Sequence, residues 1–178
     1  MIKLVRVDHR LVHGQVAVSW FNSLDVNTIF VVNDDVAHDD FRKSAIRLAK
    51  PEKSKLVMKS VADSIKAINS GITDKYKMLI VVESVADAVE LIKGTGDKIA
   101  GLNLGGTKPR EGTENYSKTI NLTAEEASEL DQLQQKGVDV WIQQVPNDER
   151  QEFRKKWLEV NNECIFNRNY FGFNCDDG

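Results

Sequence analysis

A short run near the amino terminus contains most of the side chains that could do chemistry. Residues 8–16, with the sequence DHRLVHGQV, follow a short apolar segment and precede an amphipathic one. The run combines a carboxylate, a guanidinium, two imidazoles and a glycine. This combination favours the binding or transfer of an anion, because an imidazole can carry a phosphoryl group while an arginine contacts its oxygens.

Four positions in this run fit a phosphoryl site. His13 falls at the expected start of a helix, where free backbone N–H groups and the helix dipole favour an anion. Arg10 supplies a planar fork for phosphate oxygens, Gly14 lets the backbone come close, and Asp8 is expected to orient an imidazole or Arg10. The same residue types also fit a helix cap, a surface ion pair and a turn, so both interpretations stay open.

Other active-site chemistries have less support. The chain contains no Gly-x-Ser-x-Gly elbow, no Gly-x-Gly-x-x-Gly run and no P-loop, which disfavours a serine nucleophile and a bound nucleotide. His9 and His13 are four residues apart but lie in an expected loop without a His-Glu-x-x-His pattern. The two cysteines, Cys164 and Cys175, provide neither a disulfide framework nor a zinc motif. We therefore predict no metal and no cofactor.

Length and charge narrow the class of protein. A chain of 178 residues with 41% hydrophobic residues fits one globular domain. Its 24 basic and 27 acidic side chains give a net charge of −3, and without a basic run this disfavours nucleic acid as a partner. No apolar stretch approaches the roughly 20 residues that span a bilayer, so we expect a cytosolic chain.

Periodic apolar segments predict the elements that hold the site. Seven segments are predicted to be strands: Ile2–Val7, Thr28–Val32, Lys55–Met58, Met78–Val82, Ile99–Leu104, Ser117–Leu122 and Val138–Ile142. Amphipathic helices are predicted between most of them, with start signals at Ser60, Ser84 and Thr123. Alternating strands and helices favour right-handed crossovers. The sequence thus predicts a doubly wound α/β domain, with a mostly parallel sheet of about seven strands and helices on both faces.

Two segments depart from this alternation. Residues 105–116 are polar and too short to contain a crossover helix. One edge strand of the sheet can therefore be antiparallel. The last residues lose all periodicity. We expect a single domain over residues 1–162 and a carboxyl-terminal tail of uncertain order over residues 163–178.

Ligands of open α/β sheets bind outside the carboxyl ends of the strands. Residues 8–16 begin where the first strand ends. The fifth strand is followed by residues that would border the site through backbone N–H groups or form an ordinary turn, namely Gly105, Gly106 and Thr107. Asn33 and Asp34 end the second strand, where they would flank the site, although helix capping by Asp34 or Asp35 also explains them.

The run Arg10–Val16 (RLVHGQV) closely resembles the signature of the IIB component of sugar phosphotransferase systems of the mannose, fructose, sorbose and N-acetylgalactosamine type. Further matches to that family follow in the expected order: Val32–Ala37, Arg42, Lys43, Ala49–Pro51, Asn103–Gly106 and Gln144–Pro146. The resemblance covers about residues 1–160.

The resemblance implies a cytoplasmic phosphoryl carrier. A phosphohistidine of the IIA component would pass its group to His13, usually on Nδ1, and the group would then pass to a sugar held by the membrane components IIC and IID. Arg10 would bind the phosphoryl oxygens, Asp8 would orient the group or His13, and Gly14 and Gln15 belong to the same phosphate-binding signature. The chain would act as a protein-Nπ-phosphohistidine–sugar phosphotransferase component, peripherally associated with the permease. No metal is implied, because a phosphoramidate donor is already activated.

The sequence also departs from the family. The signature more often has Asp or Glu where this chain has His9, so phosphorylation of His9 in place of His13 stays open. The residues after Gly105 differ from the commoner continuation. The sequence does not name the sugar, and although relatives are often dimers, no isolated apolar stripe requires a homodimer here.

Two other classes remain as alternatives. A receiver-like phosphoaspartate switch would use the pair Asp34-Asp35, but it needs another Asp at the end of the third strand, and Met58-Lys59-Ser60 does not supply one. In a non-catalytic anion-binding module, Arg10 would hold an anion and His13 would only cap a helix. Acid lability separates these classes, because phosphohistidine is lost in acid whereas phosphoaspartate is lost in alkali.

Overall fold

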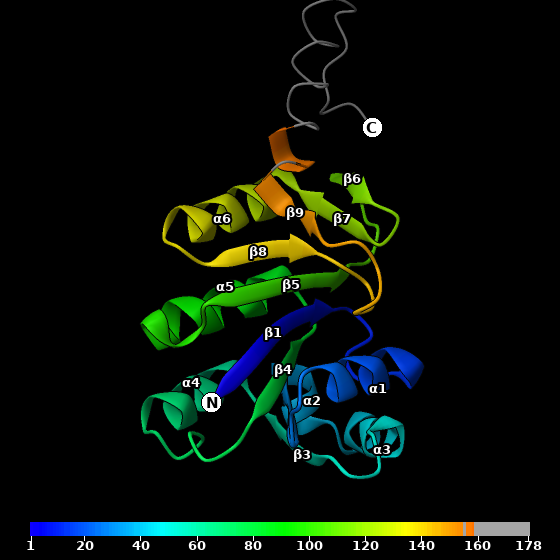
Figure 1. Cartoon of the computed structure of the whole chain (residues 1–178), viewed down its shortest axis with the longest axis vertical. Helices are drawn as coiled ribbons and strands as arrows, with labels where there is room; N and C mark the ends of the chain where they lie inside the picture. Colours follow the sequence, from blue (N-terminus) through cyan, green and yellow to red (C-terminus); the bar gives the residue numbers. More distant parts are fainter. Residues whose placement is uncertain (155, 159–178) are drawn as a thin grey trace, which may run out of the picture.

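The computed structural model describes residues 1–154 and 156–158. Strands and helices alternate over most of this length (Figure 1). In chain order the elements are β1 (Ile2–Asp8), α1 (Gly14–Ser23), β2 (Thr28–Val32), α2 (Asp34–His38), α3 (Asp40–Ala49), β3 (Lys55–Lys59), α4 (Val61–Asn69), β4 (Met78–Val82), α5 (Val85–Thr95), the 3-10 helix η1 (Gly96–Lys98), β5 (Gly101–Gly106), β6 (Thr113–Ser117), β7 (Ile120–Thr123), α6 (Ala124–Gln135), β8 (Asp139–Ile142) and β9 (Gln151–Glu152).

A seven-stranded sheet forms the centre of the molecule. Its strand order is β3-β2-β4-β1-β5-β8-β9. The neighbouring pairs are parallel except for β9, which runs antiparallel to β8 at one edge. The predicted fold class is confirmed, but the antiparallel edge strand is β9 and not part of the segment after β5 from which it was expected.

The segment after β5 differs from the sequence prediction. The predicted strand Ser117–Leu122 is wrong, because β6 ends at Ser117 and β7 begins at Ile120, with a turn between them. These two strands form a separate antiparallel hairpin, so residues 105–116 are not one loop either. The sequence TENYS of β6 buries only Tyr116. The residues of β6 do not alternate between apolar and polar, so the sequence contains no periodic signal for this strand.

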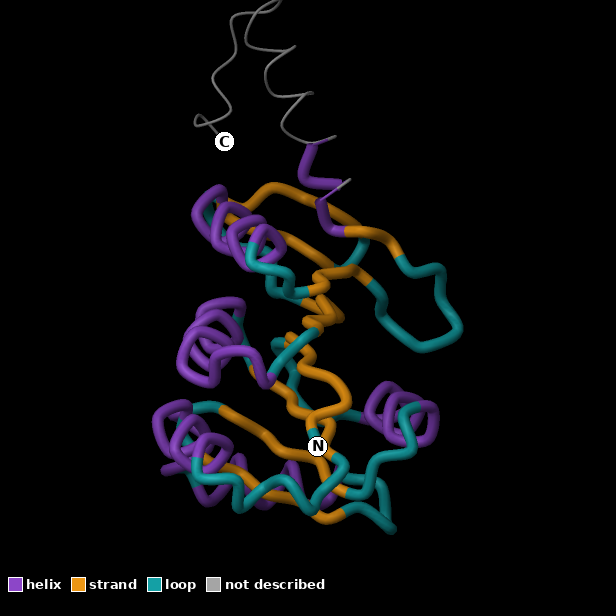
Figure 2. The backbone as a smooth tube through the Cα atoms, turned by 60° about the vertical axis from the view of Figure 1, so that its left-hand side comes forward, coloured by secondary structure: helices purple, strands orange, loops and turns teal. Residues whose placement is uncertain are grey.

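Side chains alternate between the two faces of the sheet, as the period of two in a strand requires. In β2, Phe30 and Val32 belong to the core cluster under α4, α5 and α6. Ile29 and Val31 belong to the cluster under α1, α2 and α3. Figure 2 shows helices on either side of the strands. The prediction of helices on both faces is therefore confirmed.

The predicted helix starts are present. The side chains of Ser60 and Ser84 accept hydrogen bonds from the backbone of the third residue in α4 and α5. Thr123 and Glu126 form a reciprocal capping box at the start of α6. The sequence signals were reliable here because each cap depends only on residues within one turn.

The carboxyl ends of β1 and β5 lie at the point where the chain changes direction. From β1 the chain passes through α1, on one face, toward the β3 edge. From β5 it passes through α6, on the opposite face, toward the β9 edge. Such a switch point leaves a crevice between neighbouring connections. The tail expected over residues 163–178 lies outside the described residues.

Candidate functional site

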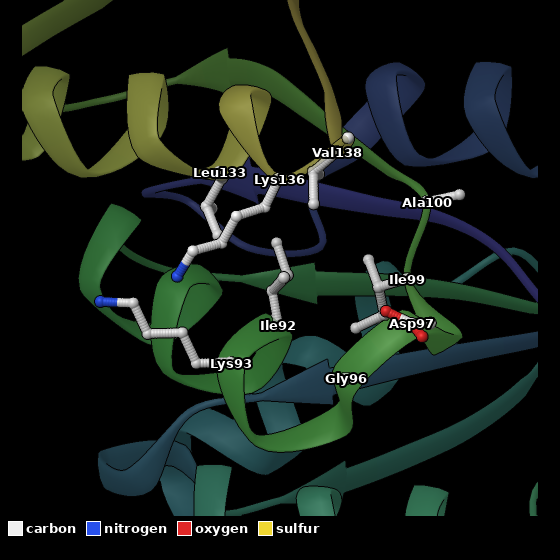
Figure 3. A pocket seen from close by; sticks show the side chains of 10 residues that line it. Ile92, Lys93, Gly96, Asp97, Ile99, Ala100, Leu133, Lys136 and Val138 are labelled. Atoms are coloured by element: carbon white, nitrogen blue, oxygen red, sulfur yellow. The ribbon is translucent and has the colours of Figure 1, made fainter.

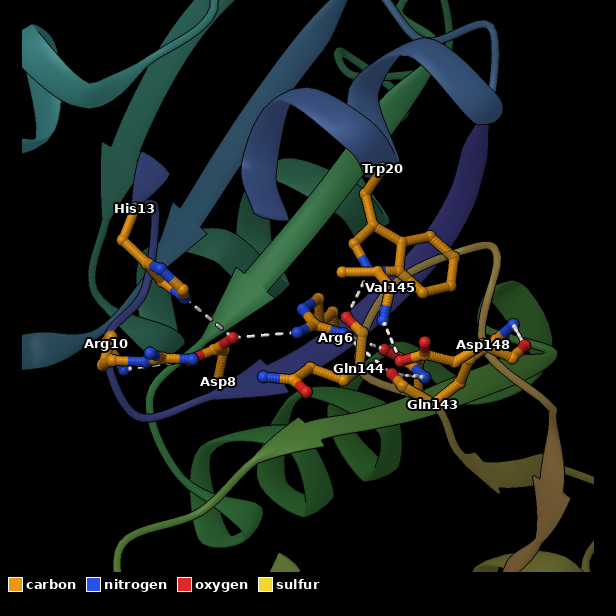
Figure 4. A network of polar contacts seen from close by, with 10 residues as sticks. Arg6, Asp8, Arg10, His13, Trp20, Gln143, Gln144, Val145 and Asp148 are labelled. Carbon is orange, nitrogen blue, oxygen red and sulfur yellow. Dashed lines mark hydrogen bonds and ion pairs between the residues drawn. The ribbon is translucent and has the colours of Figure 1, made fainter. Parts of the chain in front are cut away.

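Polar contacts converge on Asp8, the last residue of β1 (Figure 4). Its side chain is completely buried, yet one oxygen, Oδ2, accepts a hydrogen bond from Arg6 Nη2 at 2.9 Å and lies 3.1 Å from His13 Nε2. The other oxygen, Oδ1, accepts the backbone N–H of Arg10 at 3.1 Å and lies 3.5 Å from Arg10 Nε. Asp8, Arg10 and His13 are thus brought together as the sequence predicted.

Arg6 completes this network, although no role in the site was predicted for it from the sequence. It lies on the same strand face as Asp8 because the two residues are two positions apart. Only 2% of Arg6 is exposed, and its Nη1 donates to Asn103 Oδ1 at 2.5 Å and to the Gln143 carbonyl at 3.1 Å. Its guanidinium also lies 5.5 Å from the ring centre of Trp20 on α1. β1, β5 and the loop after β8 are therefore joined through one side chain.

Electrostatics hold the two buried groups in their charged forms. Burial lowers the pKa of Arg6, and the charge of Asp8 offsets only part of this effect. Arg6 nevertheless stays protonated at neutral pH, because the ordinary pKa of an arginine is so high. Burial by itself would raise the pKa of Asp8. The charge of Arg6, together with hydrogen bonds from His13 and the Arg10 backbone, outweighs burial and keeps the pKa of Asp8 below its ordinary value. Asp8 is therefore an ionised carboxylate that can only accept hydrogen bonds.

His13 precedes α1 and has an extended backbone, with φ −146° and ψ 135°. Its side chain makes no capping hydrogen bond, so the interpretation of His13 as a side-chain cap is wrong. Because Asp8 can only accept, the neutral ring carries its proton on Nε2 and leaves the lone pair of Nδ1 available. The side chain is 25% exposed, so a partner can reach the ring.

The loop that holds His13 is tightly constrained. Leu11 and Val12 are buried in the core cluster under α1. Leu11 and Gly14 adopt left-handed backbones, with φ 54° and 44°, and the Leu11 N–H donates to the Asp8 carbonyl at 2.8 Å. Gly14 and Gln15 are exposed at the start of α1, where the first amides have no helical acceptor. These amides remain available for an anion beside His13.

Gly105 has a different role from the one expected. It lies within β5 instead of in a turn, and a Cβ placed on it would come 1.9 Å from Cζ of Arg6. The absence of a side chain at Gly105 therefore provides the space that the Arg6 guanidinium occupies. Gly106 ends β5, and its carbonyl accepts the N–H of His9 at 3.0 Å.

Thr107 does not offer the donors that the sequence interpretation required. Its backbone N–H donates to the Thr119 carbonyl at 2.9 Å. Its hydroxyl donates to the Asn121 carbonyl at 2.7 Å and also accepts the Asn121 N–H at 2.6 Å. Both groups attach β5 to the β6–β7 hairpin, so the expectation that the Thr107 N–H borders a phosphoryl group is wrong.

Asn33 and Asp34 take part in local packing. The Asn33 side chain caps α2 through the Val36 N–H, and Asp34 accepts the Val61 N–H at 2.8 Å at the start of α4. Asn33 is therefore the cap of α2, whereas Asp34 satisfies the first backbone N–H of α4. No contact joins Asn33 or Asp34 to the network of Asp8 within the part of the chain that the structure describes.

His9 lies in a separate environment from His13. Its Nδ1 is buried without a hydrogen-bond partner among the described residues. It lines a pocket of about 490 Å³ with residues that begin α5 and α6 and with residues of the loop after β5, namely Ser84, Val85, Thr107, Lys108, Arg110 and Glu126. The imidazole of His9 therefore belongs to the face of the sheet that α5 and α6 cover.

A pocket of about 440 Å³ lies at the opposite end of the strands (Figure 3). It is bounded by the end of α5, η1, the end of α6 and the residues before β5 and β8. Lys93, Asp97 and Lys136 are its charged residues, and the rest of its lining is largely apolar. Its lining contains no histidine and shares no residue with the Asp8 network among the described residues. Among the described residues, no cluster of three or more His, Cys, Asp or Glu side chains could hold a metal.

The fold and the site define a doubly wound α/β domain with a partly exposed histidine, held by a buried carboxylate, at its switch point. Residues 2–165 match the family model of the PTS system sorbose subfamily IIB component. The sorbose-specific EIIB component of the PTS of Lacticaseibacillus casei is 31% identical over 160 residues, covering 90% of this chain and 97% of that protein. The mannose-specific EIIAB component of Escherichia coli (strain K12) is 28% identical over 148 residues, covering 83% of this chain and 46% of that longer protein.

The same relationship is found among solved structures. The IIBSor domain of the sorbose permease from Klebsiella pneumoniae superimposes with a TM-score of 0.84 at 26% identity, covering 90% of this chain and 98% of that domain. This chain belongs to the sorbose subfamily of PTS IIB components, as the run RLVHGQV indicated. It is therefore a phosphotransferase component of a sugar uptake system. None of the helices in the described residues is long and apolar enough to cross a membrane.

We expect Gly105→Ala to disturb the Arg6–Asp8 pair, because the added methyl group occupies the position of the guanidinium. Overpacking of this kind costs about 1–3 kcal/mol. Urea unfolding should show lower stability, and the imidazole NMR signals of His13 should shift. Gly106→Ala is the control, since its Cβ would have neighbours at an ordinary 3.5 Å. Wild-type stability and unchanged His13 signals in Gly105→Ala would refute the role given to Gly105.

We expect Asp8→Asn to be destabilised at neutral pH by about 3–5 kcal/mol, because it leaves Arg6 buried without its counter-charge. The pKa of Asp8 is lowered by folding, so its contribution is fully present above its unfolded value of about 3.9 and is lost as the pH falls through the lower folded value. The stability difference between wild type and variant should therefore shrink below about pH 4.

Urea unfolding from pH 7 to pH 3 measures this difference. Asp25→Asn is the control, because Asp25 is an exposed carboxylate that also pairs with a cation, Lys77. A pH-independent difference for Asp8→Asn, or an equal effect of Asp25→Asn, would contradict the assignment.

Proposed function

We propose that this chain is the phosphoryl carrier of a sugar phosphotransferase system and that His13 carries the group on Nδ1. Membership of the IIB family supports the general role. One observation carries the choice of atom: the buried carboxylate of Asp8 faces Nε2 of His13, which directs the free lone pair to Nδ1. The donor is a phosphohistidine of a IIA component, and the acceptor is a sugar bound by the membrane components IIC and IID.

In the first step, the Nδ1 lone pair attacks the phosphorus of the donor phosphohistidine. A nitrogen–phosphorus bond to His13 forms while the bond to the donor imidazole breaks, and the donor nitrogen keeps the electron pair. The His13 ring then carries phosphorus on Nδ1 and a proton on Nε2, which gives the ring a positive charge. The carboxylate of Asp8 lies 3.1 Å from Nε2 and stabilises that charge.

In the second step, a sugar hydroxyl attacks the same phosphorus. The bond between phosphorus and Nδ1 breaks, the lone pair returns to Nδ1, and the hydroxyl proton passes to a base on the acceptor side. Donor and acceptor must each approach nearly in line through one phosphorus atom. They therefore bind the same face of this chain one after the other.

Positive groups around His13 stabilise the moving phosphoryl oxygens. Arg10 is anchored through Nε and its backbone to Asp8, and its terminal nitrogens have no other partner among the described residues. The first amides of α1, at Gly14 and Gln15, add donors at the positive end of a helix. No metal and no other cofactor is needed, because the nitrogen–phosphorus bond of the donor is already activated.

The partners and the location follow from the family assignment. The mannose relative is named EIIAB, which supports IIA as the partner of a IIB chain. We place this chain in the cytoplasm, peripherally associated with the permease. The sugar is not assigned, because relatives named for sorbose and for mannose match this chain at similar identity.

The first test uses phosphorylated IIA of the same system as the donor. Wild type should gain one phosphoryl group that is lost in acid and survives alkali, and peptide mapping should place it on His13. His13→Ala should gain none, whereas His9→Ala and His38→Ala should be labelled normally. Nitrogen-15 NMR of the labelled ring should show phosphorus on Nδ1. Label that maps to His9, or that is lost in alkali, would contradict the proposal.

The second test concerns Arg10, whose planar fork contacts two oxygens where a lysine offers a point charge. We expect Arg10→Lys to fold normally but to accept the group about tenfold or more slowly in a single turnover, since charge developing in the transition state loses a donor. Arg110→Lys is the control, because Arg110 pairs with Glu126 outside the network. A wild-type rate in Arg10→Lys would show that Arg10 is only a surface cation.

A further inference from the structure

The outer face of α3 exposes large apolar side chains. Phe41 and Leu48 are 85% and 89% exposed. They lie seven residues apart on one helical face, and Ala45, which lies between them, is also exposed. Ile46 is the one buried residue of α3. No isolated apolar stripe was expected from the sequence. The structure corrects this expectation, because only the placement of α3 shows which of its apolar residues face outward.

Cations gather at the same end of the sheet. Between residues 43 and 59 the chain has six basic side chains and a single acidic one, Glu52, in a protein whose net charge is −3. The six are Lys43, Arg47, Lys50, Lys53, Lys55 and Lys59. They lie on α3, on the edge strand β3 and on the connection between these two elements. Arg42, just before them, is a seventh basic side chain, but it pairs with Glu83. We call residues 41–59 the basic edge.

The basic edge also contains a groove. It has a volume of about 510 Å³ and lies between α3 and β3, with an apolar floor and a basic rim, lined by Lys43, Arg47, Lys50, Leu56 and Met58. Arg47 and Lys53 make no hydrogen bond or ion pair with any described residue, so their charges are available to a partner.

We propose that the basic edge docks on an anionic lipid surface. An apolar stripe flanked by cations is the pattern of helices that lie in the membrane interface. Anionic headgroups attract such cations, and the apolar side chains enter the headgroup region. A second copy of this chain fits less well, because a two-fold contact would set the six cations against themselves. The proposal rests on the proposed function, which requires this chain to meet an acceptor in a membrane.

Docking through the basic edge would leave His13 accessible. In the sheet order, β2 and β4 separate the edge strand β3 from β1, whose end carries the His13 loop. Figure 1 shows β3 and α3 together at one end of the molecule, with β1 nearer the centre. The lipid surface and the phosphoryl donor would therefore use different parts of the chain. Attachment would raise the concentration of the carrier near its acceptor without competing with IIA.

The test is sedimentation of the full chain with vesicles at low and high salt. Wild type should bind vesicles of phosphatidylcholine with phosphatidylglycerol, should bind pure phosphatidylcholine far more weakly, and should be released by salt. Arg47→Gln with Lys53→Gln should weaken binding by about fivefold for each cation, the change that corresponds to roughly 1 kcal/mol per charge. Phe41→Ser with Leu48→Ser should weaken it by about tenfold or more.

Matched variants on other surfaces serve as controls. Lys118→Gln with Lys136→Gln removes the same charge from exposed positions outside the basic edge. Ile72→Ser removes another exposed apolar side chain, which is 65% exposed. Both should bind vesicles like wild type. All variants should accept a phosphoryl group from IIA in solution at the wild-type rate, which separates docking from the proposed function.

The proposal is overturned if wild type does not bind the anionic vesicles, if it binds both kinds of vesicle equally, or if the controls lose as much binding as the variants of the basic edge. Binding that appears only when the vesicles contain IIC and IID would assign the surface to a protein partner and would also overturn it. Failure of His13 labelling in wild type, with lipid binding as expected, would instead refute the carrier function and leave the docking surface standing.

Discussion

The buried ion pair between Arg6 and Asp8 is the constraint that organises the rest of the site. Charged groups lose hydration when they are buried, so they need counter-charges and hydrogen bonds in return. Arg6 receives them from Asp8, Asn103 and a backbone carbonyl. Asp8 receives them from Arg6, the Arg10 backbone and the ring of His13. The requirement to satisfy one carboxylate therefore fixes the orientation of the imidazole.

The same requirement extends to segments that are far apart in the sequence. Gly105 in β5 provides room for the guanidinium, and the loop after β8 supplies the carbonyl that Arg6 contacts. Trp20 of α1 lies against the guanidinium and donates its indole N–H to the Gln144 carbonyl at 3.0 Å. A change in any of these segments would reach His13 through Arg6 and Asp8. Such shared polar networks couple their members, so single substitutions in them are not independent.

The sequence could predict the features that depend on local patterns. The alternation of strands and helices indicated the doubly wound sheet, and the spacing of Asp8, Arg10 and His13 at a strand end indicated the site. No role was predicted for Arg6, because it lies within the predicted strand Ile2–Val7 and not in the run that follows that strand. The sequence did contain a signal, because Leu4, Arg6 and Asp8 are spaced two residues apart and therefore share one face of the strand. A buried charged side chain is almost always paired, and Asp8 is the neighbouring opposite charge on that face. The role of Gly105 could not be predicted, because it depends on which residue of β1 lies opposite it in space.

The two imidazoles of the loop show why residue type alone does not define an acceptor. His9 and His13 are four residues apart, but the strand end turns them toward different faces of the sheet. His13 has a carboxylate on Nε2, a partly exposed ring and helix amides beside it, whereas Nδ1 of His9 is buried without a partner. A phosphoryl acceptor needs an accessible lone pair, a counter-charge for the ring and donors for the oxygens. These contacts support the proposal that His13 is the acceptor, while the imidazole of His9 lies on the face under α5 and α6.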